Sequence, residues 1–115
     1  MTSGTQFKQK DILIIPLPFT DLTTIKQRPV LIVSNDTYNF NTEDFIVCGI
    51  TSNLKDARCS VLIESKNLIE GKLPTTSRIK VDKIINLNKS LVKKKIGVLD
   101  DKTFEKVKKE LEKLF

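Results

Sequence analysis

Three groups of polar residues stand at the edges of apolar runs, where side chains could do chemistry. Arg28 precedes a proline, and its planar guanidinium is a fixed fork of donors that suits a phosphate. Thr51 follows an apolar run and carries a hydroxyl that can donate a hydrogen bond. Arg78, Lys80 and Asp82 share one face of a predicted strand, and Asp82 is the nearby carboxylate that could accept a proton. These residue types suit charge stabilisation at a phosphodiester.

Histidine is absent from the sequence, and its absence excludes several kinds of active site. A Ser-His-Asp triad, a Cys-His pair and a two-histidine ribonuclease mechanism all need an imidazole. The two cysteines, Cys48 and Cys59, lack the C-x-x-C spacing of a zinc site. We expect both to be free thiols rather than a disulfide, and we expect no metal and no cofactor.

The formal net charge of +6 is concentrated in one part of the chain. Residues 1–65 carry 6 basic and 7 acidic side chains, residues 66–95 carry 9 and 2, and residues 96–115 carry 5 and 5. A basic segment attracts a polyanion through phosphate contacts and counterion release, so nucleic acid is the first partner to consider. The alternative is a solvated, lysine-rich face without a ligand.

Apolar, β-branched runs predict a mainly β fold. We expect strands at residues 12–15, 30–33, 45–50, 60–64 and 78–85. The runs at 30–33 and 45–50 are continuous, which indicates strands covered on both faces, by the chain itself or by a partner. Prolines end the first strand, so residues 19–28 are expected to form a long loop, and residues 34–36 to form a turn.

Helical structure is predicted at three places. Leu68 and Ile69 belong to a helical turn that stops at Gly71. Asn88 caps a short helix over residues 89–95, which Gly97 ends. Asp100 caps a C-terminal helix, and its buried face consists of Phe104, Val107, Leu111 and Leu114. The expected architecture is a small β-barrel with a short helix and a C-terminal helix packed on it.

Length and composition indicate one cytoplasmic domain. A chain of 115 residues fits a single domain over residues 1–115, with residues 1–8 as a disordered or tag-like start. No apolar run approaches the roughly 18 residues that cross a bilayer, and residues 1–10 lack the apolar centre of a signal peptide. We expect no contact with a membrane.

Successive motifs resemble those of the MazF/PemK toxins of bacterial toxin–antitoxin systems. They are Lys-Asp-Ile-Leu-Ile at 10–14, Arg-Pro-Val-Leu-Ile-Val-Ser-Asn-Asp at 28–36, Ile-Thr-Ser at 50–52 and Ile-Gly-Val-Leu-Asp at 96–100, with further similarity over 77–91. The resemblance implies an SH3-like barrel shared with the gyrase poison CcdB, a homodimer, and inhibition by a cognate antitoxin. It also implies a metal-independent endoribonuclease that cleaves single-stranded mRNA to 2′,3′-cyclic phosphate and 5′-hydroxyl ends.

The same resemblance assigns roles to individual residues. Arg28 and Thr51 fall on the family's principal catalytic pair, with Asp82 and Lys80 as auxiliary groups. Many members carry Glu-Gln where Asp82-Lys83 stand, and the family usually has Gly where Lys10 stands. The residues expected to bind RNA are Phe19, Thr20, Lys26, Gln27, Asn35, Ser52 and Arg78. Among these, Phe19 could stack on a base, as aromatic side chains do in single-strand binders.

Two other functions stay open at this point. A CcdB-like toxin that binds DNA gyrase without catalysis would use a C-terminal helix suited to a protein partner, and this chain ends in Leu114-Phe115. A catalytically silent nucleic-acid-binding relative would account for the departures at Lys80 and Asp82.

Overall fold

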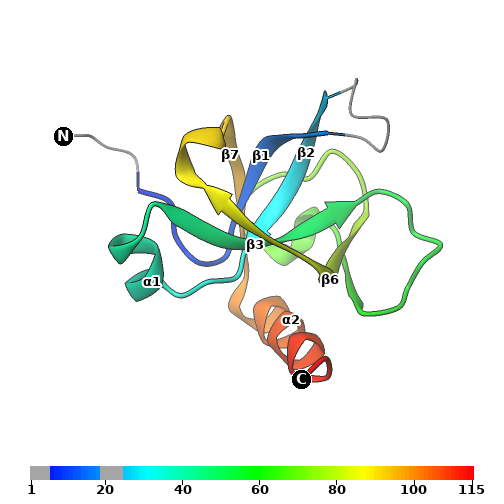
Figure 1. Ribbon diagram of the computed structural model, residues 1–115. Helices are drawn as coiled ribbons and strands as arrows, with labels where there is room; N and C mark the ends of the chain where they lie inside the picture. The colour runs from blue at the N-terminus through cyan, green and yellow to red at the C-terminus, as the bar shows by residue number, and fades with distance from the viewer. Residues whose placement is uncertain (1–5, 19–24) are drawn as a thin grey trace.

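The computed structural model describes residues 6–18 and 25–115, which fold mainly as β structure (Figure 1). The strands are β1 (Asp11–Pro18), β2 (Ile25–Ile32), β3 (Asp44–Thr51), β4 (Ser60–Ile63), β5 (Leu68–Gly71), β6 (Ser77–Asn88) and β7 (Lys94–Leu99). The helices are α1 (Asp36–Asn41) and α2 (Asp101–Glu112), with 3-10 turns η1 (Ser65–Asn67) and η2 (Lys89–Leu91). The predicted fold class, strands with a C-terminal helix packed on the sheet, is confirmed.

All seven strands belong to one antiparallel sheet, in the order β4-β6-β3-β2-β1-β7-β5. β4 and β5 stand at opposite ends of this order, yet they follow one another in the chain with only η1 and its flanking residue between them. Because each residue spans at most about 3.5 Å of extended chain, so short a link requires the two sheet edges to approach each other. The sheet therefore curls, as Figure 1 shows.

Apolar side chains pack on both faces of the curled sheet. Neighbouring residues of one strand enter different clusters: Ile12 and Leu31 belong to the first, and Leu13 and Val30 to the second, all with no exposed surface. Phe104 of α2 joins the first cluster. The prediction of strands covered on both faces is confirmed, and the chain itself supplies both covers.

β1 and β2 extend beyond the sheet as a two-stranded arm. β1 pairs with β7 only over its first half, and β2 pairs with β3 only from Val30 onward, whereas β1 and β2 pair with each other out to Pro18 and Ile25. A strand with one neighbour tolerates proline, which has no N–H for a second ladder. The predicted loop over 19–28 is therefore wrong at its second end, because β2 already includes 25–28; residues 19–24 lie outside the described residues.

Pairing with β7 decides the structure of β5. Leu68 lies opposite Leu99, so the helical turn predicted at Leu68 and Ile69 is wrong, and the turn η1 lies just before it. Gly97 does not end a helix either, since it lies within β7. A Cβ there would come within 2.8 Å of the Glu70 carbonyl oxygen, so glycine permits the close approach of β5.

Of the helix predicted over residues 89–95, only the 3-10 turn η2 forms. Asn88 is its cap, as expected, and accepts a hydrogen bond from Ser90 N at 2.9 Å. The residues that follow take strand conformation as β7, because β1 and β5 pair with them on both sides. A non-local partner has outweighed the local helical pattern.

The two α-helices begin at side-chain caps. Asp100 accepts from Thr103 N at 2.7 Å, and Phe104 and Val107 are buried as predicted, with Leu111 partly buried against them. The predicted burial of Leu114 is wrong, because α2 ends before it and its side chain is exposed. α1 replaces the turn predicted at 34–36, because Asn35 and Asp36 suit a helix start as well as a turn. Among the described residues, no helix is long and apolar enough to cross a membrane.

The start of the described chain packs on the sheet. Phe7 lies edge-on against Phe45, with ring centroids 6.2 Å apart. Residues 1–5, which form most of the predicted disordered start, lie outside the described residues.

Candidate functional site

Arg28 lies on β2 where the two-stranded arm leaves the sheet. Its backbone pairs with Ile15 of β1, and β3 begins to pair with β2 two residues later, at Val30. The side chain is half-buried. Arg28 thus lies inside a strand, whereas the sequence places it just before one. Its position is set by the ladder with β1 rather than by a loop.

Thr51 ends β3 and pairs with Arg78 of β6. Val30 pairs with Gly49 as the last pair between β2 and β3, and Arg28 and Thr51 each lie two residues beyond that pair, so both side chains are on the same face as it. Directly opposed residues of antiparallel strands face the same side of the sheet. Arg28, Thr51 and Arg78 therefore form one row across three adjacent strands.

The Thr51 hydroxyl is already oriented by its own backbone. Its Oγ1 accepts a hydrogen bond from Asn53 N at 3.1 Å, the turn contact typical of a threonine after a strand. Because the oxygen acts as the acceptor, the hydroxyl hydrogen stays available to donate to a ligand.

A pocket of about 170 Å³ reaches Arg28, but Thr51 and Arg78 are not among its lining residues. Its lining consists of Arg28, Pro29, Ile50, Ser52, Leu73, Pro74, Thr75 and Ser77. The segment 73–77, which leads into β6 and includes its first residue, supplies half of the lining. Sequence reasoning missed it because it has neither an apolar period nor a charged side chain to mark it. The pocket gives Arg28 and Ser52 a common cavity, whereas Thr51, the neighbour of the lining residue Ile50 on β3, faces the other side of the sheet.

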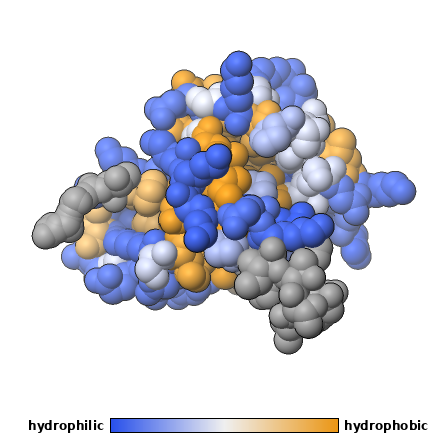
Figure 2. All heavy atoms as spheres, turned by 90° about the horizontal axis from the view of Figure 1, so that it is seen from above, coloured by the Kyte–Doolittle hydropathy of each residue, from blue (hydrophilic) through white to orange (hydrophobic). Residues whose placement is uncertain are grey.

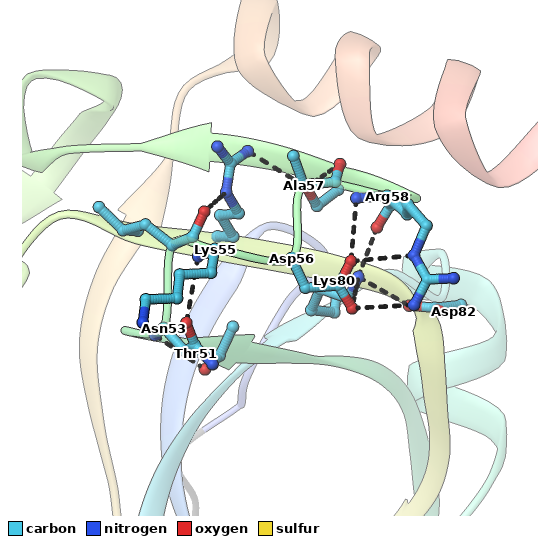
Figure 3. A network of polar contacts seen from close by, with 11 residues as sticks. Thr51, Asn53, Lys55, Asp56, Ala57, Arg58, Lys80 and Asp82 are labelled. Atoms are coloured by element: carbon cyan, nitrogen blue, oxygen red, sulfur yellow. Dashed lines mark hydrogen bonds and ion pairs between the residues drawn. The ribbon is translucent and has the colours of Figure 1, made fainter.

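Lys80 differs from the other charged residues of β6 because it is buried, with 5% of its surface exposed. Its Nζ lies 3.3 Å from Asp56 and 3.7 Å from Asp82, and it also donates to the Arg58 carbonyl oxygen (Figure 3). A register shift between Cys48 and Gly49 in the pairing of β3 with β6 interrupts the simple alternation predicted along this strand.

The carboxylate of Asp56 is held in its charged form. A hydrogen bond from Arg58 Nε at 3.2 Å, together with the nearby Lys80, holds the pKa of Asp56 well below its usual range. The same hydrogen bond raises the pKa of Arg58. Both side chains are therefore ionised at neutral pH.

Neither cysteine takes part in a disulfide, so the predicted free thiols are confirmed. Cys48 is buried, and burial, with a smaller effect of Asp82, raises the pKa of its thiol to about 12. It is protonated at neutral pH and is not a nucleophile.

The other predicted RNA-binding residues lie in different places. Lys26 and Gln27 are exposed on the arm, next to Arg28. Asn35 follows the opposite end of β2 and accepts from Tyr38 N at 2.8 Å as the cap of α1, so the structure does not bring it to the row. Phe19 and Thr20 lie outside the described residues.

The cations of the basic segment 66–95 are distributed over separate strands. Lys80 is buried, and Lys89 lies 5.3 Å from the centre of the Phe45 ring. Lys95 of β7 pairs with Glu70 at 3.5 Å, and three strands separate β7 from β6 in the sheet. Figure 2 shows hydrophilic side chains spread around exposed apolar atoms on one face. The charge of this segment therefore does not map onto a single strand.

Comparison with known families decides where the chain belongs. A family model described as the PemK-like, MazF-like toxin of type II toxin–antitoxin systems matches residues 8–115. The chain belongs to this toxin family. Endoribonuclease MazF of Staphylococcus saprophyticus is 34% identical over 80 residues, which cover 70% of this chain and 66% of that relative, just under two thirds of its length.

Solved structures of MazF toxins have the same fold as this PemK/MazF-like chain. MazE-MazF (Form-II) of Deinococcus radiodurans gives a TM-score of 0.78 at 16% identity and covers 96% of both chains. An endoribonuclease in complex with its cognate antitoxin, from a mycobacterial species, gives 0.76 at 21% identity and covers 92% of this chain and 91% of its own. Toxin MazF-mt6 of Mycobacterium tuberculosis gives 0.72 at 20% identity, covering 90% of this chain and 93% of its own.

Two further features bear on this PemK/MazF-like toxin. Lys10 has a φ of 82°, in the left-handed region that favours glycine, the residue that the resemblance leads one to expect there. Lys10 also pairs with Asp101 at 2.6 Å. Over residues 6–18 and 25–115, no group of three His, Cys, Asp or Glu side chains is placed to hold a metal ion.

Proposed function

We propose that this PemK/MazF-like chain is an endoribonuclease that cleaves single-stranded RNA, mRNA in particular, and acts in the cytoplasm. The observation that carries the proposal is the position of Arg28 and Thr51 on one face of the sheet, with Arg28 also lining a pocket, on a chain that matches the toxin family over residues 8–115. The relative named Endoribonuclease MazF, at 34% identity, supports the same activity.

The proposed reaction is attack of a ribose 2′-oxygen on the adjacent phosphorus. A P–O2′ bond forms and the P–O5′ bond breaks, which gives a 2′,3′-cyclic phosphate and a 5′-hydroxyl end. The proton that the 2′-hydroxyl loses passes to water and the leaving 5′-oxygen takes one from water, so the step is redox-neutral and leaves the proton count unchanged. The protein must then stabilise the charge that develops on the phosphorane oxygens.

Arg28 and Thr51 take these roles in the proposal. Arg28 directs its fork of N–H donors at the phosphorane oxygens, and its planar geometry suits two of them at once. Thr51 donates its hydroxyl hydrogen, because its oxygen already accepts from Asn53 N. Both side chains are half-buried, so water screens their interactions with phosphate less than it would at an exposed site.

The RNA strand in this proposal follows the row and the arm. Lys26 and Gln27 contact it from the arm, Ser52 from the pocket, and Arg78 from β6. Phe19 and Thr20 stay in the proposal as predictions from sequence. Asn35 is left out, because it caps α1 at the far end of β2.

We further propose a homodimer and inhibition by a cognate antitoxin. Large apolar side chains stay exposed in the single chain, among them Ile69 at 72%, Phe40 at 53% and Leu62 at 46%, and such surface favours association. The fold neighbour whose structure is a complex with its cognate antitoxin supports the second partner.

The test is incubation of the protein with a long single-stranded RNA, with and without EDTA, followed by mapping of the new ends. The proposal expects discrete cuts in both samples, with cyclic phosphate on one side and 5′-hydroxyl on the other. Cleavage lost in EDTA would remove the metal-free mechanism. Intact RNA together with trapped gyrase–DNA complexes would favour the gyrase-binding alternative. The exposed apolar side chain of Phe115 could contact a protein partner and supports that alternative.

A further inference from the structure

The loop between β3 and β4, residues 52–59, is tied to β6 by two basic side chains. Arg78 Nε donates to the Leu54 carbonyl oxygen at 2.9 Å, and Lys80 donates to the Arg58 carbonyl oxygen. Arg78 and Lys80 share one face of the sheet with Thr51, since Arg78 pairs with Thr51 and Lys80 with the residue two positions before it. The loop therefore folds back over the face that carries the proposed catalytic row (Figure 3).

Because Lys80 is buried, the attachment of the loop to β6 is energetically important. A buried ammonium is costly unless charged and polar partners replace the water that it loses. Its partners are Asp56 at 3.3 Å, Asp82 at 3.7 Å and the Arg58 carbonyl oxygen. Two of these three belong to the loop. If the loop moved away, the ammonium would keep only Asp82 from this set, so the burial of Lys80 and the position of the loop depend on each other.

Asp56 links Lys80 to the rest of the loop. Its carboxylate accepts hydrogen bonds from Arg58 Nε and from Arg58 N, both at 3.2 Å, while it faces Lys80 on its other side. Arg58 holds the pKa of Asp56 low, so this carboxylate is charged at neutral pH. Figure 3 shows Asp56 between Arg58 and Lys80.

The side chains that the loop exposes suit an RNA strand. Asn53, Leu54 and Lys55 are exposed and follow directly on Ser52, which lines the pocket beside Arg28. An amide can read a base edge, an apolar side chain can support a base, and a lysine can pair with phosphate. Asn53 also accepts from Lys55 N at 3.1 Å, which gives this tip a defined turn.

We propose that Lys80 is a positioning residue: with Asp56 it clamps the loop 52–59 against β6, and so sets the surface that binds the RNA strand next to Arg28 and Thr51. The inference rests on the proposed ribonuclease function and replaces the catalytic role that the sequence suggests for Lys80. Under this inference, loss of the clamp weakens RNA binding, while Arg28 and Thr51 stay in place for the chemical step.

The experiment compares Asp56→Asn with Glu105→Gln in steady-state cleavage of a single-stranded RNA that the parent protein cuts. Each variant removes one negative charge; Glu105 is exposed on α2, and within residues 6–18 and 25–115 its ion pair is with Lys108, at 3.4 Å. Added positive charge alone attracts RNA and lowers KM. Loss of the clamp has the opposite effect on KM. Asp56→Asn therefore raises KM about tenfold with kcat within about twofold of the parent, whereas Glu105→Gln does not raise KM.

Hydrogen exchange gives an independent measure of the clamp. Amides of residues 53–59 exchange faster in Asp56→Asn and in Lys80→Met than in the parent, while those of β1 and β2 do not change. A parental KM in Asp56→Asn, or a fall in kcat with KM unchanged, overturns the inference; the second result would return the cluster to a catalytic role. A parent protein that cuts no RNA refutes the proposed function instead.

Discussion

Replacement of Arg28 by alanine separates a catalytic arginine from a structural one. The backbone of Arg28 pairs with Ile15 in the β1–β2 ladder, and alanine preserves those main-chain bonds. The side chain is half-buried and belongs to neither apolar cluster. We therefore expect the free energy of unfolding to change by less than about 1 kcal/mol, the range of substitutions outside a core.

The effect on cleavage is expected to be much larger. Loss of a donor that stabilises developing charge typically costs about 3 kcal/mol in the barrier, so kcat should fall about a hundredfold or more. Arg28→Lys restores the charge but not the planar fork, and should recover little of the rate. Lys106→Ala, which removes an exposed cation on α2, is the matched control and should cut RNA at nearly the parental rate.

The assay pairs cleavage of a labelled single-stranded RNA with urea unfolding of the same samples. The unfolding curve decides whether a lost activity reflects chemistry or a lost fold. Cleavage by Arg28→Ala at the parental rate, or a large shift of its unfolding midpoint, would show that Arg28 has a structural role and that the proposed mechanism is wrong.

Four other outcomes are expected. Thr51→Val lowers kcat about a hundredfold while Thr51→Ser keeps most of it, because only serine retains the donor, and single-turnover cleavage measures both. RNA affinity falls by about 0.7 log units per contacted phosphate for each tenfold rise in salt, which a filter-binding titration checks, and a flat profile would count against phosphate contacts. Phe104→Ala destabilises the fold by about 3–5 kcal/mol in urea unfolding, because Phe104 is buried in the first apolar cluster, whereas the exposed Lys108→Ala does not. Finally, the pKa of the Cys48 thiol is raised from 9.0 to about 12 in the folded protein, so the unfolded chain releases this proton at lower pH. The free energy of unfolding therefore falls as the pH rises from 9 towards 12. Cys48→Ala should reduce this fall, which unfolding curves at several pH values measure.

The local features of the fold were predictable from residue order. The continuous apolar runs at 30–33 and 45–50 predicted strands covered on both faces, and the structure divides their buried residues between two clusters. Asp100 and the apolar period after it predicted α2 with its cap. These signals act over a few residues, because they depend on side-chain periodicity and on hydrogen bonds to the nearest backbone.

Elements that depend on a distant partner were predicted wrongly. Residues 68–71 take strand conformation because they pair with the end of β7, and residues 94–95 because they pair with β1; no pattern within either segment specifies its partner. The prolines at the end of β1 are compatible with a strand only because β7 stops pairing with β1 before them. A proline fits a strand where no second neighbouring strand needs a hydrogen bond from its nitrogen, and the sequence does not show whether that second strand is present.

The candidate site divides in the same way. The sequence by itself determined which groups are available: an arginine before a proline, a threonine after an apolar run, and no histidine anywhere in the chain. Only the tertiary structure decided that Arg28 and Thr51 share one row, and that Lys80 is buried against the loop 52–59. The sequence gives the type and charge of each residue directly. Strand register and burial arise from contacts between distant segments, so the orientation of a side chain and its partners could not be predicted from the sequence.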